Sequence, residues 1–321
     1  MNLRLATFVG LALVMVVAWI SAFVVWRAAE IGELVAPIDQ RGFTQLTAVT
    51  VGTGGSYENP ERMGPSTAVG WAYRIVLVDV GRGVCEGLRS ARIPLRQPSI
   101  VLLTNLLPVN TVGLDDLLYT GWQQDREAPL RVIGPPGTRA LVDGLLRAHA
   151  GGGAGLVAAL PLPEAGGRID VVEVETEFEE EIDGVVVRAG LLPGGPMPAL
   201  AWRFERGRKS IVVSGTGWAP EALESFAKDA SLLIHEGVYI PPVDDLEDAG
   251  VVADPERLAR EAAVHTPLQA VGGLATRAGV EALALVRLRP PPFFDVQVRS
   301  IVAEDFAGHV YVPEDGSELS P

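Results

Sequence analysis

The chain has 321 residues, carries a formal net charge of −14 and contains one cysteine, Cys85. This length allows one large domain or two small ones with a full buried core. The single cysteine excludes an intramolecular disulfide framework and a zinc site built from several cysteines. The acidic balance argues against nucleic acid as a partner, because phosphate binding needs clustered lysine and arginine.

The N-terminus contains an uncharged apolar run that begins at Leu5 and ends at Trp26. It is long enough to cross the roughly 30 Å hydrocarbon core of a bilayer. A cleaved signal peptide is the alternative, but its apolar region is shorter and a small-x-small cleavage site follows it. We therefore predict a signal-anchor transmembrane helix over residues 1–27. The distribution of basic residues slightly favours a cytoplasmic N-terminus, which predicts a single-pass membrane protein whose large domain is extracytoplasmic.

The rest of the chain alternates short apolar runs with turn clusters. After a juxtamembrane linker (28–44), a domain is expected over 45–313, followed by a polar tail (314–321). Runs rich in Val, Ile and Leu predict strands at 46–51, 72–79, 99–104, 130–133, 169–174, 184–189, 199–205, 210–214, 231–235 and 283–288. Helical spacing predicts helices at 139–149, 220–228 and 255–278. Residues 151–155 are expected to form a glycine-rich loop, and 241–255 an acidic loop. Helices between strands indicate a layered α/β domain with mixed sheets.

Several short motifs follow one another in a characteristic order. They include Val51-Gly52-Thr53-Gly54-Gly55, Leu77-Val78-Asp79-Val80-Gly81, Leu102-Leu103-Thr104, Ser214-Gly215, His235-Glu236 and His265-Thr266-Pro267. The series resembles the metallo-β-lactamase fold superfamily, in its ribonuclease Z and arylsulfatase-like branch. The resemblance covers about residues 46–312. It implies an αβ/βα four-layer sandwich with two metal ions, usually zinc, at one edge.

The metal-ligand positions implied by this resemblance carry other residues. The family motif Thr-His-x-His-x-Asp-His is matched by residues 104–110, and the remaining ligands fall on three later positions. The residues at these positions are Asn105, Leu107, Val109, Asn110, Gly194, Thr216 and Arg287. Leucine and valine have no donor atom, asparagine is a poor zinc ligand, and arginine is a permanent cation. We therefore expect no zinc and no other cofactor. If Arg287 points into the site, it would repel a metal and supply part of the positive charge.

Other family features are retained. Asp79 matches an aspartate that supports the site loop, while His235, Glu236 and His265 match a glutamate–histidine pair that assists proton transfer. Without a metal we expect these three residues to keep structural hydrogen bonds, so no catalytic residue is assigned.

The remaining polar residues that stand out receive structural assignments. We expect packing or surface roles for Cys85, His149 and His309. Asp115 and Asp116 are expected at a helix N-terminus, where acidic residues are favourable. The acidic residues at 244–248 lack the spacing of a calcium loop and are expected to be solvated.

These observations predict a membrane-anchored, non-catalytic pseudoenzyme that binds a ligand in the old cleft or pairs with another chain. The pair would be a homodimer or a heterodimer with an active relative. The alternative is a metal-independent hydrolase of phosphate or sulfate esters that uses His235, Glu236 and His265. A third possibility is a structural domain whose cleft is filled by Leu106, Leu107 and Val109. An open pocket where Asn105, Asn110, Thr216 and Arg287 converge would favour binding.

Overall fold

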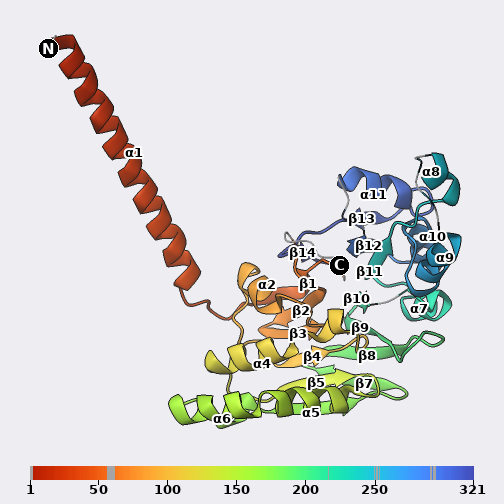
Figure 1. The fold of residues 1–321 in the computed structure, drawn as a ribbon. Helices are drawn as coiled ribbons and strands as arrows, with labels where there is room; N and C mark the ends of the chain where they lie inside the picture. Colours follow the sequence, from red (N-terminus) through yellow and green to blue (C-terminus); the bar gives the residue numbers. More distant parts are fainter. Residues whose placement is uncertain are drawn as a thin grey trace. The chain divides into compact units, whose positions relative to one another are not determined.

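The computed structural model describes residues 3–55, 62–215, 217–248, 250, 252, 254–289, 291 and 294–321. The chain divides into two compact units, Met1–Asp39 and Gln40–Pro321 (Figure 1). Thr216, one of the residues expected at the site, lies outside the described residues. Each unit is described by itself.

The first unit is one long helix, α1 (Leu3–Val35). Its segment Phe8–Gly32 is long and apolar enough to cross a bilayer, by length and composition. The apolar run was predicted correctly, but the helix continues into the segment expected to be a linker. An ion pair between Arg27 and Glu30, one turn apart, supports this extension.

The described strands of the second unit form two seven-stranded sheets. The first has the order β14-β1-β2-β3-β4-β5-β6 and the second β13-β12-β11-β10-β9-β8-β7. The first sheet consists of β1 (Phe43–Gly52), β2 (Ser66–Ala72), β3 (Arg74–Val78), β4 (Ile100–Leu102), β5 (Leu130–Gly134), β6 (Ile169–Glu173) and β14 (Glu318–Leu319). The second consists of β7 (Phe178–Ile182), β8 (Val185–Leu191), β9 (Leu200–Arg206), β10 (Lys209–Ser214), β11 (Leu232–Val238), β12 (Ala282–Arg289) and β13 (His309–Tyr311).

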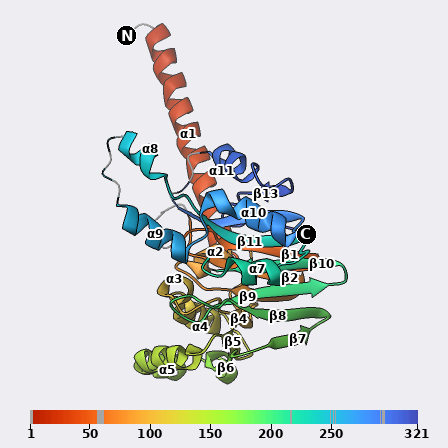
Figure 2. The same ribbon diagram turned by 90° about the vertical axis from the view of Figure 1, so that its right-hand side faces the viewer.

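Helices cover the outer faces of both sheets. The helices between β3 and β6 are α2 (Val84–Ser90), α3 (Pro108–Thr111), α4 (Leu114–Gln123), α5 (Thr138–Ala148), α6 (Ala150–Ala159) and the 3-10 turn η1 (Glu164–Gly167). Those after β10 are α7 (Pro220–Phe226), α8 (Val243–Asp248), α9 (Pro255–Val264), α10 (Leu268–Ala278) and α11 (Asp295–Val302). Figure 2 shows α4 and α5 beside the first sheet and α7 and α10 beside the second.

Three apolar cores hold these layers together. One core fills the space between the sheets, with Trp71 and Phe204 as large members. A second joins β1, β3, β4 and β5 to α2 and α4, and a third joins the second sheet to α7, α10 and α11. The order helix, sheet, sheet, helix confirms the αβ/βα four-layer sandwich.

Several local expectations fail for identifiable reasons. The run predicted as a strand at 72–79 corresponds to β3, because Ala72 adopts a left-handed backbone with φ 46° and ends β2, a strand that was not predicted. Strand β7 was missed because its sequence FEEEI is mostly charged. In the structure three of its five residues are nevertheless buried or partly buried. The glycine-rich segment 151–155 lies in helix α6, and the acidic segment contains helix α8. The polar tail contributes β14, which pairs with β1 and buries Leu319.

The structural assignments of Cys85, Asp115 and Asp116 agree with the fold. Cys85 is a residue of α2 whose side chain is buried in the core, and this burial raises the pKa of its thiol. Asp115 and Asp116 lie in the first turn of α4. His149 contacts Asp115 at 2.7 Å near the surface, and His309 stacks edge-on against Tyr311.

Candidate functional site

The polar residues singled out from the sequence meet where strands of both sheets end. Asp79 follows β3 and Thr104 follows β4, two neighbouring parallel strands of the first sheet. Glu236 and Arg287 lie near the ends of β11 and β12, which are parallel neighbours in the second sheet. The carboxyl ends of parallel strands are where α/β proteins commonly place ligand sites.

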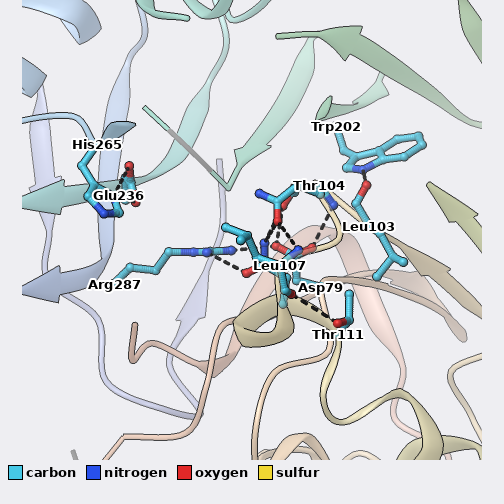
Figure 3. A network of polar contacts seen from close by, with 11 residues as sticks. Asp79, Leu103, Thr104, Leu107, Thr111, Trp202, Glu236, His265 and Arg287 are labelled. Carbon is cyan, nitrogen blue, oxygen red and sulfur yellow. Dashed lines mark hydrogen bonds and ion pairs between the residues drawn. The ribbon is translucent and has the colours of Figure 1, made fainter. Parts of the chain in front are cut away.

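Asp79 is the buried centre of the first cluster. Its carboxylate accepts bonds from the Thr104 amide at 2.8 Å, from the Thr104 hydroxyl at 2.8 Å and from Arg287 Nη2 at 2.7 Å (Figure 3). Burial raises the pKa of Asp79, while the charge of Arg287 and the Thr104 donors oppose that rise. Thr104 follows a strand of the first sheet and Arg287 belongs to β12 of the second sheet, so Asp79 joins the two sheets.

Arg287 reaches the first sheet because β12 is irregular at this position. Glu236 pairs with Val286 and Val238 with Arg289, so β12 has an extra residue between these pairs. Arg287 has a left-handed backbone with φ 56°, and its amide donates to the carbonyl of Thr53 at 2.7 Å. A bulge of this kind redirects a side chain, and its strain must be offset by the surroundings.

Two asparagines complete the cluster. Arg287 Nη1 donates to Asn110 Oδ1 at 2.8 Å, and Asn110 Nδ2 donates to Asn105 Oδ1 at 2.7 Å. Asn105 Oδ1 also accepts the Leu107 amide at 3.0 Å, which fixes the start of α3. Asn105, Asn110 and Arg287 therefore converge, as the resemblance implied. Gly194 does not join them: it adopts φ 84° in an exposed turn with no atom near its missing side chain.

A second cluster pairs Glu236 with His265. His265 Nδ1 lies 3.2 Å from both carboxylate oxygens of Glu236, and the Thr266 amide donates to Oε1 at 3.3 Å. Glu236 is buried, whereas His265 exposes 28% of its side chain. A buried carboxylate that accepts from Nδ1 fixes the imidazole tautomer and leaves Nε2 for proton exchange.

His235 lies apart from this pair. Neighbouring residues of a strand point to opposite faces, and the His235 ring contacts the Thr266 hydroxyl at 2.7 Å through Nε2. Burial lowers the pKa of His235 to about 4, so the ring is neutral at pH 7. Among the described residues its Nδ1 has no hydrogen-bond partner. His235 is therefore a buried structural residue and lines no part of the pocket described next.

A pocket of about 460 Å³ opens beside both clusters. Its polar wall contains Glu236, His265, Arg287 and Arg289. The apolar residues that line the pocket are Leu107, Pro108, Val109, Pro196, Met197, Trp218, Val238 and Val264, and Gly55 and Gly215 also line it. Leu107 and Val109 line this space without filling it, so the structural domain with a plugged cleft is not what the fold shows.

The side chains described at this site do not supply the histidine and carboxylate ligand set of a dinuclear zinc centre. In the described parts of the chain, no group of three or more His, Cys, Asp or Glu residues could hold a metal ion. The Asp79 carboxylate is bonded to Arg287, whose cation competes with a metal for the same oxygens. We therefore derive no reaction step through zinc.

Comparison with known proteins decides the family. No protein-family model matches the chain. Ribonuclease Z of Mycobacterium sp. (strain KMS) is 30% identical over 275 residues, which cover 84% of this chain and 94% of the relative. The chain belongs to the ribonuclease Z family. Ribonuclease Z of Mycobacterium tuberculosis is 29% identical over 279 residues, covering 84% of this chain and 96% of the relative.

Solved structures agree with the fold of this ribonuclease Z family member. The metallo-β-lactamase fold protein YhfI of Bacillus subtilis superposes with a TM-score of 0.66 at 16% identity, over 85% of this chain and 98% of its own. Human tRNase Z, short form, gives 0.63 at 18% identity, over 86% and 99%. Zn²⁺-bound PqqB of Methylobacterium extorquens gives 0.57 at 18% identity, over 86% and 100%.

These findings overturn the prediction of a non-catalytic pseudoenzyme without zinc. The matches to the two mycobacterial relatives cover nearly the whole length of each relative, and both are named Ribonuclease Z, which points to a catalytic hydrolase. A protein with a similar fold is Zn²⁺-bound. The prediction equated substituted ligand positions with lost activity and lost metal. The substitutions at Leu107 and Val109 leave both the Glu236–His265 pair and an open pocket in place.

Proposed function

We propose that this ribonuclease Z family member hydrolyses phosphodiesters in the pocket beside Glu236 and His265. One observation carries the proposal: the Glu236–His265 pair lies in the same pocket as Arg287 and Arg289. A proton-transfer group next to fixed cations is what cleavage of an anionic ester needs. The names of the curated relatives support the same reaction class.

His265 has the proton-transfer role in this proposal. Glu236 accepts a hydrogen bond from His265 Nδ1 and so aligns the ring, and the Thr266 amide donates to the same carboxylate. The second ring nitrogen, Nε2, then moves one proton: it takes the proton from the water whose oxygen bonds to phosphorus, and it passes that proton to the leaving oxygen as the bond between this oxygen and phosphorus breaks. A positioned general acid or base of this kind contributes about 10²–10⁴-fold to the rate.

Arg287 has the electrostatic role. Asp79 and Asn110 fix its guanidinium, so it needs no reorganisation when charge develops on the phosphoryl oxygens. The Thr53 carbonyl holds its backbone in the left-handed conformation that directs the side chain to the site. Arg289 lies farther along the same strand, 3.5 Å from Glu261, and adds a second cation to the pocket wall.

Hydrolysis assays with the full chain in detergent test this proposal. The substrates are bis(4-nitrophenyl) phosphate and a precursor tRNA, each assayed with and without added Zn²⁺. We expect cleavage of a phosphodiester, and a loss of at least about 100-fold in His265→Ala. The matched control is His309→Ala, because His309 is exposed and pairs with Ala282, at the opposite end of β12 from Arg287 and Arg289. Absence of cleavage of both substrates, or equal rates in the two variants, would refute the proposal.

We also propose that α1 is an uncleaved signal anchor and that the large unit lies outside the cytoplasm. The apolar segment of α1 and the flanking basic residues support this topology. C-terminal fusions to alkaline phosphatase and to green fluorescent protein test it. We expect phosphatase activity and no fluorescence, and the reverse result would place the large unit in the cytoplasm.

A further inference from the structure

We infer that the pocket takes a small, singly charged phosphodiester with an apolar or aromatic group, rather than a polynucleotide. The inference rests on the proposed function, because it names the substrate class of the same site. Three properties of the pocket carry it: the balance of its charges, the nature of its walls and its size.

The positive charges of the pocket are already matched by carboxylates. Arg287 lies 2.7 Å from Asp79, and Arg289 lies 3.5 Å from Glu261. Glu236 brings a further negative charge into the pocket wall. The pocket therefore offers little net positive charge, which suits one phosphate rather than the run of phosphates in RNA. The chain as a whole carries a net charge of −14, which also repels a polyanion.

The remaining lining is apolar and comes from α3, β11, α9 and the loops that contain Pro196 and Trp218. Trp218 is held in place because its indole nitrogen donates to the Leu192 carbonyl at 3.3 Å. The loop of Pro196 and Met197 packs directly on this ring, since a side chain added at Gly195 would lie 2.1 Å from the indole nitrogen. A fixed indole in a pocket that also contains Arg287 and Arg289 suits an aromatic or apolar ester group, which can stack on the ring.

The size of the pocket fits the same substrate class. Its volume of about 460 Å³ lies within the range of about 300–1,000 Å³ that is usual for small-molecule sites. The pocket combines four polar or charged lining residues, Glu236, His265, Arg287 and Arg289, with a mostly apolar remainder. This combination matches a compact amphiphilic ester.

Calorimetric titration of the full chain in detergent tests the inference. The probes are diphenyl phosphate, phenyl phosphate and a single-stranded oligouridylate, each also titrated into detergent alone. We expect diphenyl phosphate to bind, phenyl phosphate to bind more weakly because it carries two charges, and oligouridylate to show no binding. Trp218→Ala and Arg289→Gln should each weaken diphenyl phosphate binding about tenfold, while Trp218→Phe, which keeps a stacking ring, should retain most of the affinity.

Two variants serve as matched controls. Tyr73→Ala removes an exposed aromatic ring outside the pocket, and Arg260→Gln removes an exposed arginine on α9. Both should bind diphenyl phosphate like the unmodified chain. Preferential binding of oligouridylate, or unchanged affinity in Trp218→Ala, would overturn the inference.

The outcomes separate this inference from the proposed function. A chain that cleaves precursor tRNA but does not bind diphenyl phosphate overturns the inference and keeps the hydrolase. A chain that binds diphenyl phosphate but cleaves no phosphodiester overturns the reaction and supports the ligand class.

Discussion

The Arg287 guanidinium donates to the Asp79 carboxylate at 2.7 Å and so joins the second sheet to the first. Both side chains are buried, and both residues have left-handed backbones, with φ 60° at Asp79 and 56° at Arg287. Neither residue is a glycine, so each conformation is held by its surroundings at a cost of about 1–3 kcal/mol. The pair is thus a buried contact between two strained residues, of which Arg287 also lines the pocket.

Removing one partner of this pair should destabilise the protein strongly. Arg287→Met leaves the Asp79 carboxylate buried without its cation, which costs about 3–5 kcal/mol in the free energy of unfolding. Urea unfolding of the full chain in detergent measures this change in the free energy of unfolding. The control is Arg277→Ala, which breaks an ion pair with Glu224 at the surface and should cost less than about 1 kcal/mol. Equal losses in the two variants would show that Arg287 and Asp79 are not coupled as described.

The double variant Asp79→Asn/Arg287→Met tests the coupling itself. Because it removes both charges together, its loss of stability should be smaller than the sum of the two single losses. Strict additivity in the same urea experiments would contradict a direct interaction.

The C-terminal segment contacts the loop that holds the backbone of Arg287. The Asp315 carboxylate accepts the Thr53 amide at 2.7 Å, the Thr53 hydroxyl at 2.6 Å and the Met63 amide at 2.5 Å. The Thr53 carbonyl in turn holds the Arg287 amide. Asp315→Ala should therefore reduce kcat for bis(4-nitrophenyl) phosphate about tenfold, because it loosens Arg287.

The matched control for Asp315 is its neighbour Glu314. The hydrogen bonds of Glu314 in the described structure use its backbone, and its side chain is exposed. Glu314→Ala should leave kcat unchanged. If Asp315→Ala behaves like Glu314→Ala, the C-terminal segment does not position the site.

The buried His235 should make stability depend on pH. Its pKa is about 4 in the folded protein and about 6.5 in the unfolded chain. The unfolded chain therefore takes up the proton first, so stability is full above pH 6.5 and falls as the pH is lowered towards 4. We expect this group to lower the free energy of unfolding by about 2 kcal/mol between pH 7 and pH 5. Urea unfolding at the two pH values should show that His235→Gln lacks this part of the loss. An identical pH dependence in both chains would rule out a buried neutral histidine.

Much of the fold could be predicted because apolar runs directly mark buried strands. Strands β5, β6, β9 and β10 lie within a residue or two of their predicted bounds. Strand β7 could not be found this way, because its glutamates interrupt the apolar pattern, and its place is set by pairing with β8. Helix α6 was missed because glycine disfavours helices locally.

The site was predictable in composition but not in geometry. The ordered motifs assigned Asn105, Asn110 and Arg287 to one site, and in the structure these three side chains are joined by hydrogen bonds. The bulge that turns Arg287 inward depends on the pairing of β11 and β12, which a single sequence does not display. The contact of Asp315 with Thr53 spans 262 positions and leaves no local signal. The error about catalysis arose from ranking the hydrolase that uses His235, Glu236 and His265 below a pseudoenzyme because the metal-ligand positions are substituted.

The rate of bis(4-nitrophenyl) phosphate hydrolysis by Glu236→Gln tests the central claim most directly. Glu236 aligns His265 without lying open to solvent, so its neutral replacement should lower kcat about 100-fold or more and change KM little. Glu256→Gln, a change at an exposed glutamate of α9, provides the control and should match the unmodified chain. A kcat of Glu236→Gln equal to that of Glu256→Gln would contradict the assignment of the Glu236–His265 pair as the proton-transfer centre.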